Sequence, residues 1–183
     1  MTNLIYSNSC SFGAQGQGHR IYPEVVSDTL GAHLINCGRS GSSNRRIIRT
    51  ALRDLIKLKK EYNNISVLLG LTFIERTELW QPWLPAVDDD GHFSTIIVDY
   101  KKIDWSIHGL IKTIVPDIHT LADARIQEYY KQWLIHYNPE STITDLLTDI
   151  IMFAGWAKNN NINYSIFSNV DVLPGNDKVG YTS

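Results

Sequence analysis

The segment from Ile65 to Leu71 most constrains the fold, because it is almost continuously apolar over a length typical of a strand. A strand with one face in water would alternate apolar and polar residues, so this strand needs cover on both faces. Shorter apolar segments occur at residues 4–6, 33–36 and 162–167. Helical patterns separate them. The alternation predicts an α/β protein, with a parallel sheet between two helical layers in a three-layer α/β/α sandwich.

Three of the predicted helices follow the first three strands. Residues 23–30 form the first, with proline in its first turn and a glycine at its end. Residues 44–62 form a long helix with an apolar face at helical spacing, and Ser42 or Ser43 can cap it. A third helix is predicted over about 121–136.

The middle of the chain, residues 73–120, is rich in tryptophan and proline and has no clear period. We interpret it as an irregular insertion that carries a hairpin over residues 92–100, within one domain that spans residues 1–183. A last helix is predicted over residues 142–158, because Thr142 and Asp145 have the spacing of a capping box.

Composition excludes several classes of protein. The 183 residues carry a formal net charge of -2, which argues against binding nucleic acid through bulk charge. The longest apolar runs are well short of the roughly 20 residues of a membrane span. Two cysteines provide neither a disulfide framework nor a zinc ligand set. We therefore expect a cytoplasmic protein with no membrane partner, no metal and no organic cofactor.

Polar and glycine-rich residues follow the predicted strands at 7–18, 37–44 and 70–78. Parallel sheets bind their ligands beyond the carboxyl ends of the strands, so these loops should meet at one site. A serine in the first loop can act as a nucleophile if a base removes its proton. Backbone N–H groups in the second loop, at a helix start, are suited to developing negative charge.

The first loop resembles the first motif of the SGNH (GDSL-type) hydrolases, in the branch that reads N-G-C-S-F-T. The matching residues here are Asn8-Ser9-Cys10-Ser11-Phe12-Gly13. This resemblance implies a flavodoxin-like, mainly parallel sheet and makes Ser11 the nucleophile. A second register, which sets Ser7-Asn8-Ser9 against G-D-S, gives that role to Ser9. We prefer Ser11, because Cys-Ser-Phe is intact.

The resemblance continues into the second and third motifs. Asn36, Gly38 and Gly41 match N-x-G-x-x-G, which implies that the Gly41 N–H belongs to an oxyanion hole. Residues 42–47 resemble G-S-S-N-x-R-I, and Asn44 in that stretch, with Arg76 after the third strand, is a candidate substrate-binding residue.

Three features depart from the family pattern. Ser9 replaces the glycine of the first motif. Thr72 replaces the asparagine of the third motif, so its hydroxyl is the candidate oxyanion donor in place of an amide. The family carries D-x-x-H beyond its final strand, but no histidine follows Phe167.

The base is therefore the missing part of the triad. A D-x-x-H string occurs at residues 89–92, inside the insertion, where chance explains the spacing better than function does. Since a triad is defined by geometry, His92 is retained as a candidate base, with His108 and His119 as further possibilities. Loss of a C-terminal segment is the other explanation.

We expect a serine hydrolase that cleaves an acyl ester, with a small molecule or a glycan as the substrate. A catalytically silent binding domain that keeps the pocket is the alternative. A binder of nucleic acid or phosphorylated ligands that uses the basic helix is a third class, whose affinity would fall steeply with salt. Homo-oligomer formation is left open.

Overall fold

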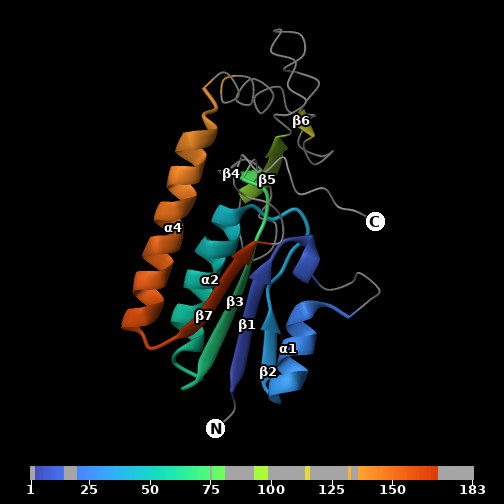
Figure 1. The fold of residues 1–183 in the computed structure, drawn as a ribbon, viewed down its shortest axis with the longest axis vertical. Helices are drawn as coiled ribbons and strands as arrows, with labels where there is room; N and C mark the ends of the chain where they lie inside the picture. The colour runs from blue at the N-terminus through green and yellow to red at the C-terminus, as the bar shows by residue number, and fades with distance from the viewer. Residues whose placement is uncertain are drawn as a thin grey trace, which may run out of the picture.

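A four-stranded, all-parallel sheet is the centre of the computed structural model (Figure 1). The structure describes residues 3–14, 20–74, 76–80, 93–98, 114–115, 132 and 136–168. In spatial order the strands are β2 (His33–Asn36), β1 (Leu4–Ser9), β3 (Ile65–Leu71) and β7 (Asn163–Ser168). The predicted parallel sheet is confirmed. The first strand extends further than predicted, through Ser7 to Ser9, because β2 and β3 pair with it on both sides.

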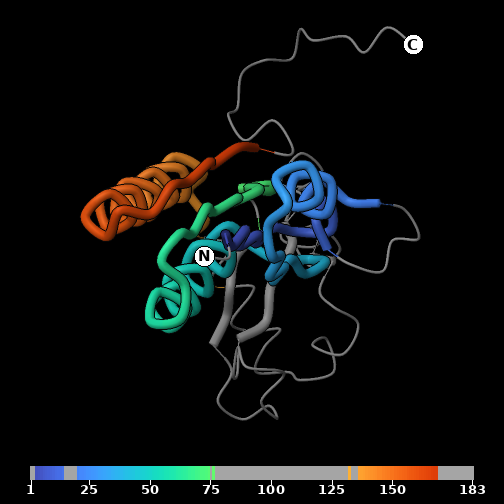
Figure 2. Tube along the Cα trace, turned by 90° about the horizontal axis from the view of Figure 1, so that it is seen from below, coloured from blue at the N-terminus to red at the C-terminus, as the bar shows by residue number. Residues whose placement is uncertain are grey.

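Helices flank this sheet on both faces. Helices α2 (Asn44–Leu58) and α4 (Pro139–Asn159) pack side by side on one face, while α1 (Tyr22–Leu30) covers the other face over β1 and β2 (Figure 2). The strand order explains this arrangement. The chain moves outward from β1 to β2 through α1 and returns across β1 to β3 through α2, so right-handed crossovers place the two helices on opposite faces.

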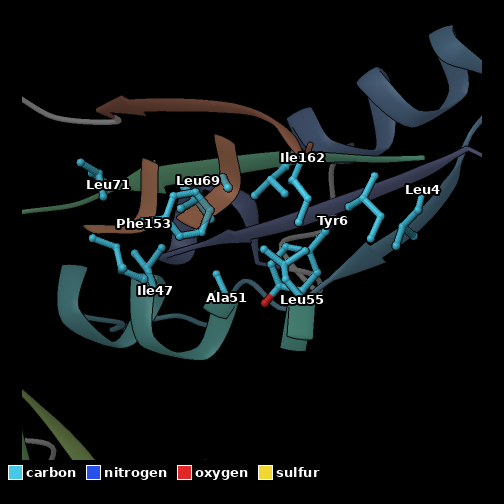
Figure 3. Packing of buried hydrophobic residues seen from close by; sticks show 13 residues of the cluster. Leu4, Tyr6, Ile47, Ala51, Leu55, Leu69, Leu71, Phe153 and Ile162 are labelled. Carbon is cyan, nitrogen blue, oxygen red and sulfur yellow. The ribbon is translucent and has the colours of Figure 1, made fainter. Parts of the chain in front are cut away.

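The main core lies between the sheet and the pair α2 and α4 (Figure 3). Helix α2 contributes Ile47, Ala51 and Leu55, one residue per turn, and all three are fully buried. Phe153 of α4 joins the same cluster and is also fully buried. Burial of each of the large side chains, Ile47, Leu55 and Phe153, contributes about 1.5–3 kcal/mol, and that of Ala51 contributes less. This face therefore holds the two helices on the sheet.

Two helix starts show how local sequence sets the boundaries. The Ser43 hydroxyl caps α2 by accepting a hydrogen bond from the Arg46 N–H at 3.1 Å, which selects Ser43 from the two candidates. The capping box predicted for α4 is wrong. The helix begins earlier, at Pro139, because Asn138 accepts from the Glu140 N–H at 2.9 Å and proline favours the first turn.

The insertion contributes a second sheet, with strands β4 (Arg76–Trp80), β5 (Phe93–Val98) and β6 (Ile114–Val115) in antiparallel order β4-β5-β6. The predicted hairpin over residues 92–100 is therefore wrong in its pairing. Residues 93–98 form one strand, which pairs with β4 and β6 instead of folding back on itself. Most of the helix predicted over 121–136 lies outside the described residues.

None of the helices in the described part of the chain combines the length and the apolar character needed to cross a bilayer.

Candidate active site

The carboxyl ends of β1, β2 and β3 lie at one edge of the sheet, and the chain leaves each of them through a polar loop (Figure 1). The loops are residues 10–14, 37–43 and 72–74. This edge is where parallel sheets bind ligands, and the structure brings the serine loop and the glycine loop together there.

Strand β1 sends its polar side chains to opposite faces near this edge. Asn8 faces α2, where its amide donates to Thr50 Oγ1 at 2.7 Å and to the Ile47 carbonyl at 3.2 Å. Ser7 and Ser9 face the other way, and their side chains are fully buried. Asn8 therefore ties β1 to α2, a role that the sequence did not reveal because its partners come about 40 residues later.

The two candidate nucleophiles differ in accessibility. Ser9 ends β1, is fully buried and donates to its neighbour's carbonyl, that of Cys10, at 3.2 Å. Ser11 begins a short 3-10 helix, η1 (Ser11–Gly13), and the residue as a whole is partly exposed. A substrate arriving at the edge of the sheet can reach Ser11 without a rearrangement of the strand, but it cannot reach Ser9 in this arrangement.

The motif at Asn36 and Gly38 holds the serine loop in place. The Asn36 amide donates to the Gly13 carbonyl at 2.8 Å, and its oxygen accepts from the Gly38 N–H at 3.0 Å. A Cβ at Gly38 would lie only 2.7 Å from the Gly13 oxygen. The Arg39 N–H adds a bond to the Ser9 carbonyl at 2.9 Å. The close approach of the Gly13 backbone explains the glycine at position 38, and no catalytic role is needed to account for it.

Gly41 lies further along the same loop, with φ at 79°, a left-handed conformation that glycine adopts without strain. It is partly exposed, and the space where a Cβ would project is open. Ser42 then closes the turn by donating from its N–H to the Arg39 carbonyl at 3.2 Å. The conformation at Gly41 turns the chain directly into the start of α2.

Asn44 and Thr72 form a buried clamp between the start of α2 and the end of β3. The Asn44 amide donates to the Thr72 carbonyl at 2.9 Å, and its oxygen accepts from the Thr72 N–H at 2.7 Å. Thr72 Oγ1 is buried and has no hydrogen-bond partner among the described residues. The clamp fixes the third loop against the second, so Asn44 has a structural role besides the predicted contact with substrate.

Tyr22 at the start of α1 adds a phenol to the serine face of β1. A Cβ at Gly13 would collide with Ser9 Oγ and lie 2.9 Å from the Tyr22 oxygen, so the two hydroxyls are close. Burial raises the pKa of Tyr22, and the Ser9 and Ser7 hydroxyls offset part of that rise. Within the described residues, Ser7 Oγ and the Tyr22 hydroxyl make no hydrogen bond. Tyr22 gave no signal in the sequence.

A second buried phenol lies on the opposite face. The Tyr6 hydroxyl donates to Asp54 Oδ2 at 2.9 Å, and Asp54 also pairs with Arg53 at 2.9 Å. Burial strongly raises the pKa of Tyr6, and Cys37 and Asp54 add to the shift. Burial likewise raises the pKa of the Cys37 thiol. The Tyr6 phenol and the Cys37 thiol therefore stay neutral at physiological pH, and they support the core rather than supply a nucleophile.

The candidate base His92, with His108 and His119, lies outside the described residues. Among those that the structure describes, His33 begins β2 beside Leu4 and contacts the Tyr62 hydroxyl at 3.0 Å. Ser9 is five strand positions further along β1 than Leu4, so His33 is roughly 16 Å from the serine loop. His33 is too distant to serve as the base.

A cleft of about 340 Å³ opens between the first turn of α2 and the first three turns of α4. Its lining consists of Asn44, Arg45, Ile74, Thr142, Asp145, Leu146, Thr148 and Asp149. Burial raises the pKa of Asp149, the Arg45 guanidinium opposes the shift, and the Asp145 carboxylate adds to it. The sequence gave no sign of this cleft, because its two walls are about 100 residues apart in the chain.

Within the described part of the chain, no group of three or more His, Cys, Asp or Glu side chains is placed to hold a metal ion. The sequence matches no protein-family model, and no curated protein shows significant similarity to it. The function is therefore inferred from the residues of the site.

Proposed function

We propose that this chain is an SGNH-like serine hydrolase that cleaves an acyl ester, with Ser11 as the nucleophile. The observation that carries the proposal is the position of Ser11. It is a partly exposed serine directly after a buried parallel strand, in a loop held by the Asn36 and Gly38 motif. The proposal includes a flavodoxin-like α/β/α domain over residues 1–183 and a small-molecule or glycan ester as the substrate.

In the proposed reaction, Ser11 Oγ attacks the ester carbonyl carbon while a base takes the hydroxyl proton. The carbonyl oxygen becomes an oxyanion, for which the N–H groups of Ser11 and Gly41 are the proposed donors, with the Thr72 hydroxyl as a third. Collapse of the intermediate expels the alcohol, which receives the proton from the base. Water then releases the acyl group and restores Ser11.

Two observations support the proposed donors. Gly41 N–H belongs to a turn that leads into a helix start, where the helix dipole favours negative charge. Thr72 Oγ1 has no acceptor among the described residues, so its donor capacity is unused. The Thr72 side chain is fully buried, and an approaching oxygen would need a small local movement to meet it. The base is proposed to be His92 or another histidine of the insertion.

The alternative is a silent binding domain that keeps the site but not the chemistry. The position of His33, far from Ser11, favours it. His136, the other histidine among the described residues, is exposed in the turn before α4, and no contact with the serine loop is seen for it. In that case the loops would still bind an ester or a glycan without turnover.

Hydrolysis of 4-nitrophenyl acetate distinguishes the serine hydrolase from the silent binding domain. Ser11→Ala is the test variant and Ser9→Ala is the matched control. A nucleophile should lose at least about 1,000-fold in kcat, whereas the buried Ser9 should tolerate alanine with little change in rate. Circular dichroism shows whether each variant is folded. Equal rates for wild type and Ser11→Ala would rule out this nucleophile. Absence of turnover by the folded wild type would favour the silent domain.

A further inference from the structure

The Arg76 guanidinium at the start of β4 carries a positive charge that no carboxylate among the described residues neutralises. Its Nη1 donates to the Ser42 carbonyl at a long 3.4 Å. Its Cζ lies 5.2 Å from the centre of the Phe73 ring, which holds the planar group from one side. Its Nε is buried and has no hydrogen-bond partner among the described residues.

A buried guanidinium N–H without an acceptor costs free energy unless a ligand supplies that acceptor. Buried polar atoms in proteins are nearly always hydrogen-bonded, and an arginine offers five N–H donors. Other arginines in the described residues show the usual solution. Arg20 pairs with Asp28, and Arg53 pairs with Asp54. The unused donors of Arg76 therefore point to a ligand.

The place of Arg76 in the fold connects it with the candidate active site. Ser42, which accepts its long hydrogen bond, directly follows Gly41 in the loop proposed to bind the oxyanion. Arg76 is partly exposed as a whole residue, so a ligand at this edge of the sheet can reach the outer part of the guanidinium. Phe73 and Ser42 fix its orientation in advance, which lowers the entropy cost of binding.

We propose that Arg76 binds an anionic group, a carboxylate or a phosphate, on the ligand that occupies the Ser11 site. Both groups match the planar fork of arginine in a bidentate contact. The inference rests on the proposed function, and it narrows the substrate to an ester whose non-reacting part carries a negative charge.

A measurement of anion binding tests the role of Arg76 without requiring catalytic turnover. Titration calorimetry with glutarate and with inorganic phosphate compares wild type, Arg76→Gln, Arg76→Lys and Arg45→Gln. We expect affinity to fall about tenfold or more in Arg76→Gln and less in Arg76→Lys, which keeps the charge but loses the fork. Arg45→Gln is the matched control, because Arg45 lines the cleft with Asp149 and its charge interacts with that carboxylate. The anion affinity of this variant should change less than about twofold. Binding of one anion only would identify which group the site takes.

Two results would overturn the inference: no saturable binding of either anion by wild type, or the same loss of affinity in Arg45→Gln as in Arg76→Gln. Arg76→Lys serves as the test if Arg76→Gln does not fold. Kinetics then separate this inference from the proposed function. The ratio of kcat/KM for 4-nitrophenyl hydrogen glutarate over 4-nitrophenyl butyrate should fall about tenfold in Arg76→Gln. Anion binding that depends on Arg76, without hydrolysis of either ester, would refute the hydrolase and keep the anion site.

Discussion

Replacement of Asn44 by alanine should destabilise the protein strongly, because it removes both hydrogen bonds of the clamp. The Thr72 N–H and carbonyl, at 2.7 and 2.9 Å from the Asn44 side chain, would lose their partners in a buried position. An orphaned buried polar group costs about 1–3 kcal/mol, so two of them cost about 2–6 kcal/mol. Water that enters the vacated space offsets part of this, and we expect a loss of about 3 kcal/mol.

Urea denaturation followed by tryptophan fluorescence measures this loss. With an m value of about 2 kcal/mol/M, the midpoint should fall by about 1.5 M. Asn64→Ala is the matched control, since its amide donates to the Asn3 side chain at 2.7 Å on the exposed surface. That variant should lose less than about 0.5 kcal/mol. If both variants lost the same small amount, the clamp would contribute nothing beyond an ordinary surface hydrogen bond, and the reasoning from burial would be wrong.

Three further predictions concern the same framework. Gly38→Ala should cost about 1–3 kcal/mol in urea denaturation, because its Cβ would lie 2.7 Å from the Gly13 oxygen; an unchanged midpoint would contradict this close contact. Phe153→Ala should cost about 3–5 kcal/mol by the same measurement through loss of core packing, and a loss below 1 kcal/mol would mean that α4 is not anchored there. Asp149→Asn should raise the melting temperature at pH 7. The pKa of Asp149 is raised in the folded state, so its ionisation costs stability once the pH exceeds the ordinary pKa of an aspartate. The advantage of the asparagine variant should shrink as the pH falls toward that ordinary value. An advantage independent of pH would refute the titration argument.

Strand and helix order could be predicted from the sequence because the signals are local. The apolar run of β3, the periodic face of α2 and the serine cap at its start depend on neighbouring residues only. The extension of β1 to Ser9 could not be predicted in this way. Polar side chains usually end a strand, but here Ser7, Asn8 and Ser9 are buried within a central strand that has partners on both sides.

In the insertion, too, pairing between distant segments could not be predicted from local sequence. The strand at residues 93–98 pairs with β4, which ends 12 residues before it, and with β6, which begins 15 residues after it. Hairpin rules for short turns do not cover such separations. The start of α4 depended on competition between two local signals, and the combination of Asn138 and Pro139 prevailed over the capping box.

For the candidate site, the sequence located the loops but not their mutual contacts. The serine loop, Gly41 and Thr72 follow neighbouring strands, and the parallel sheet brings their loops to one edge. The Asn44 clamp, the Tyr22 phenol and the contact of Arg76 with Ser42 depend on segments that are distant in the chain. No local pattern encodes such contacts, so only the structure could reveal them.

Covalent labelling of Ser11 tests the central claim most directly. Wild-type protein treated with diisopropyl fluorophosphate should gain one phosphoryl adduct, which peptide mass spectrometry should assign to Ser11 and not to the buried Ser9. Ser11→Ala should remain unlabelled, while Ser9→Ala should label as wild type does. An adduct on another serine, or an unlabelled wild type that is folded, would contradict the account of Ser11 as the activated nucleophile.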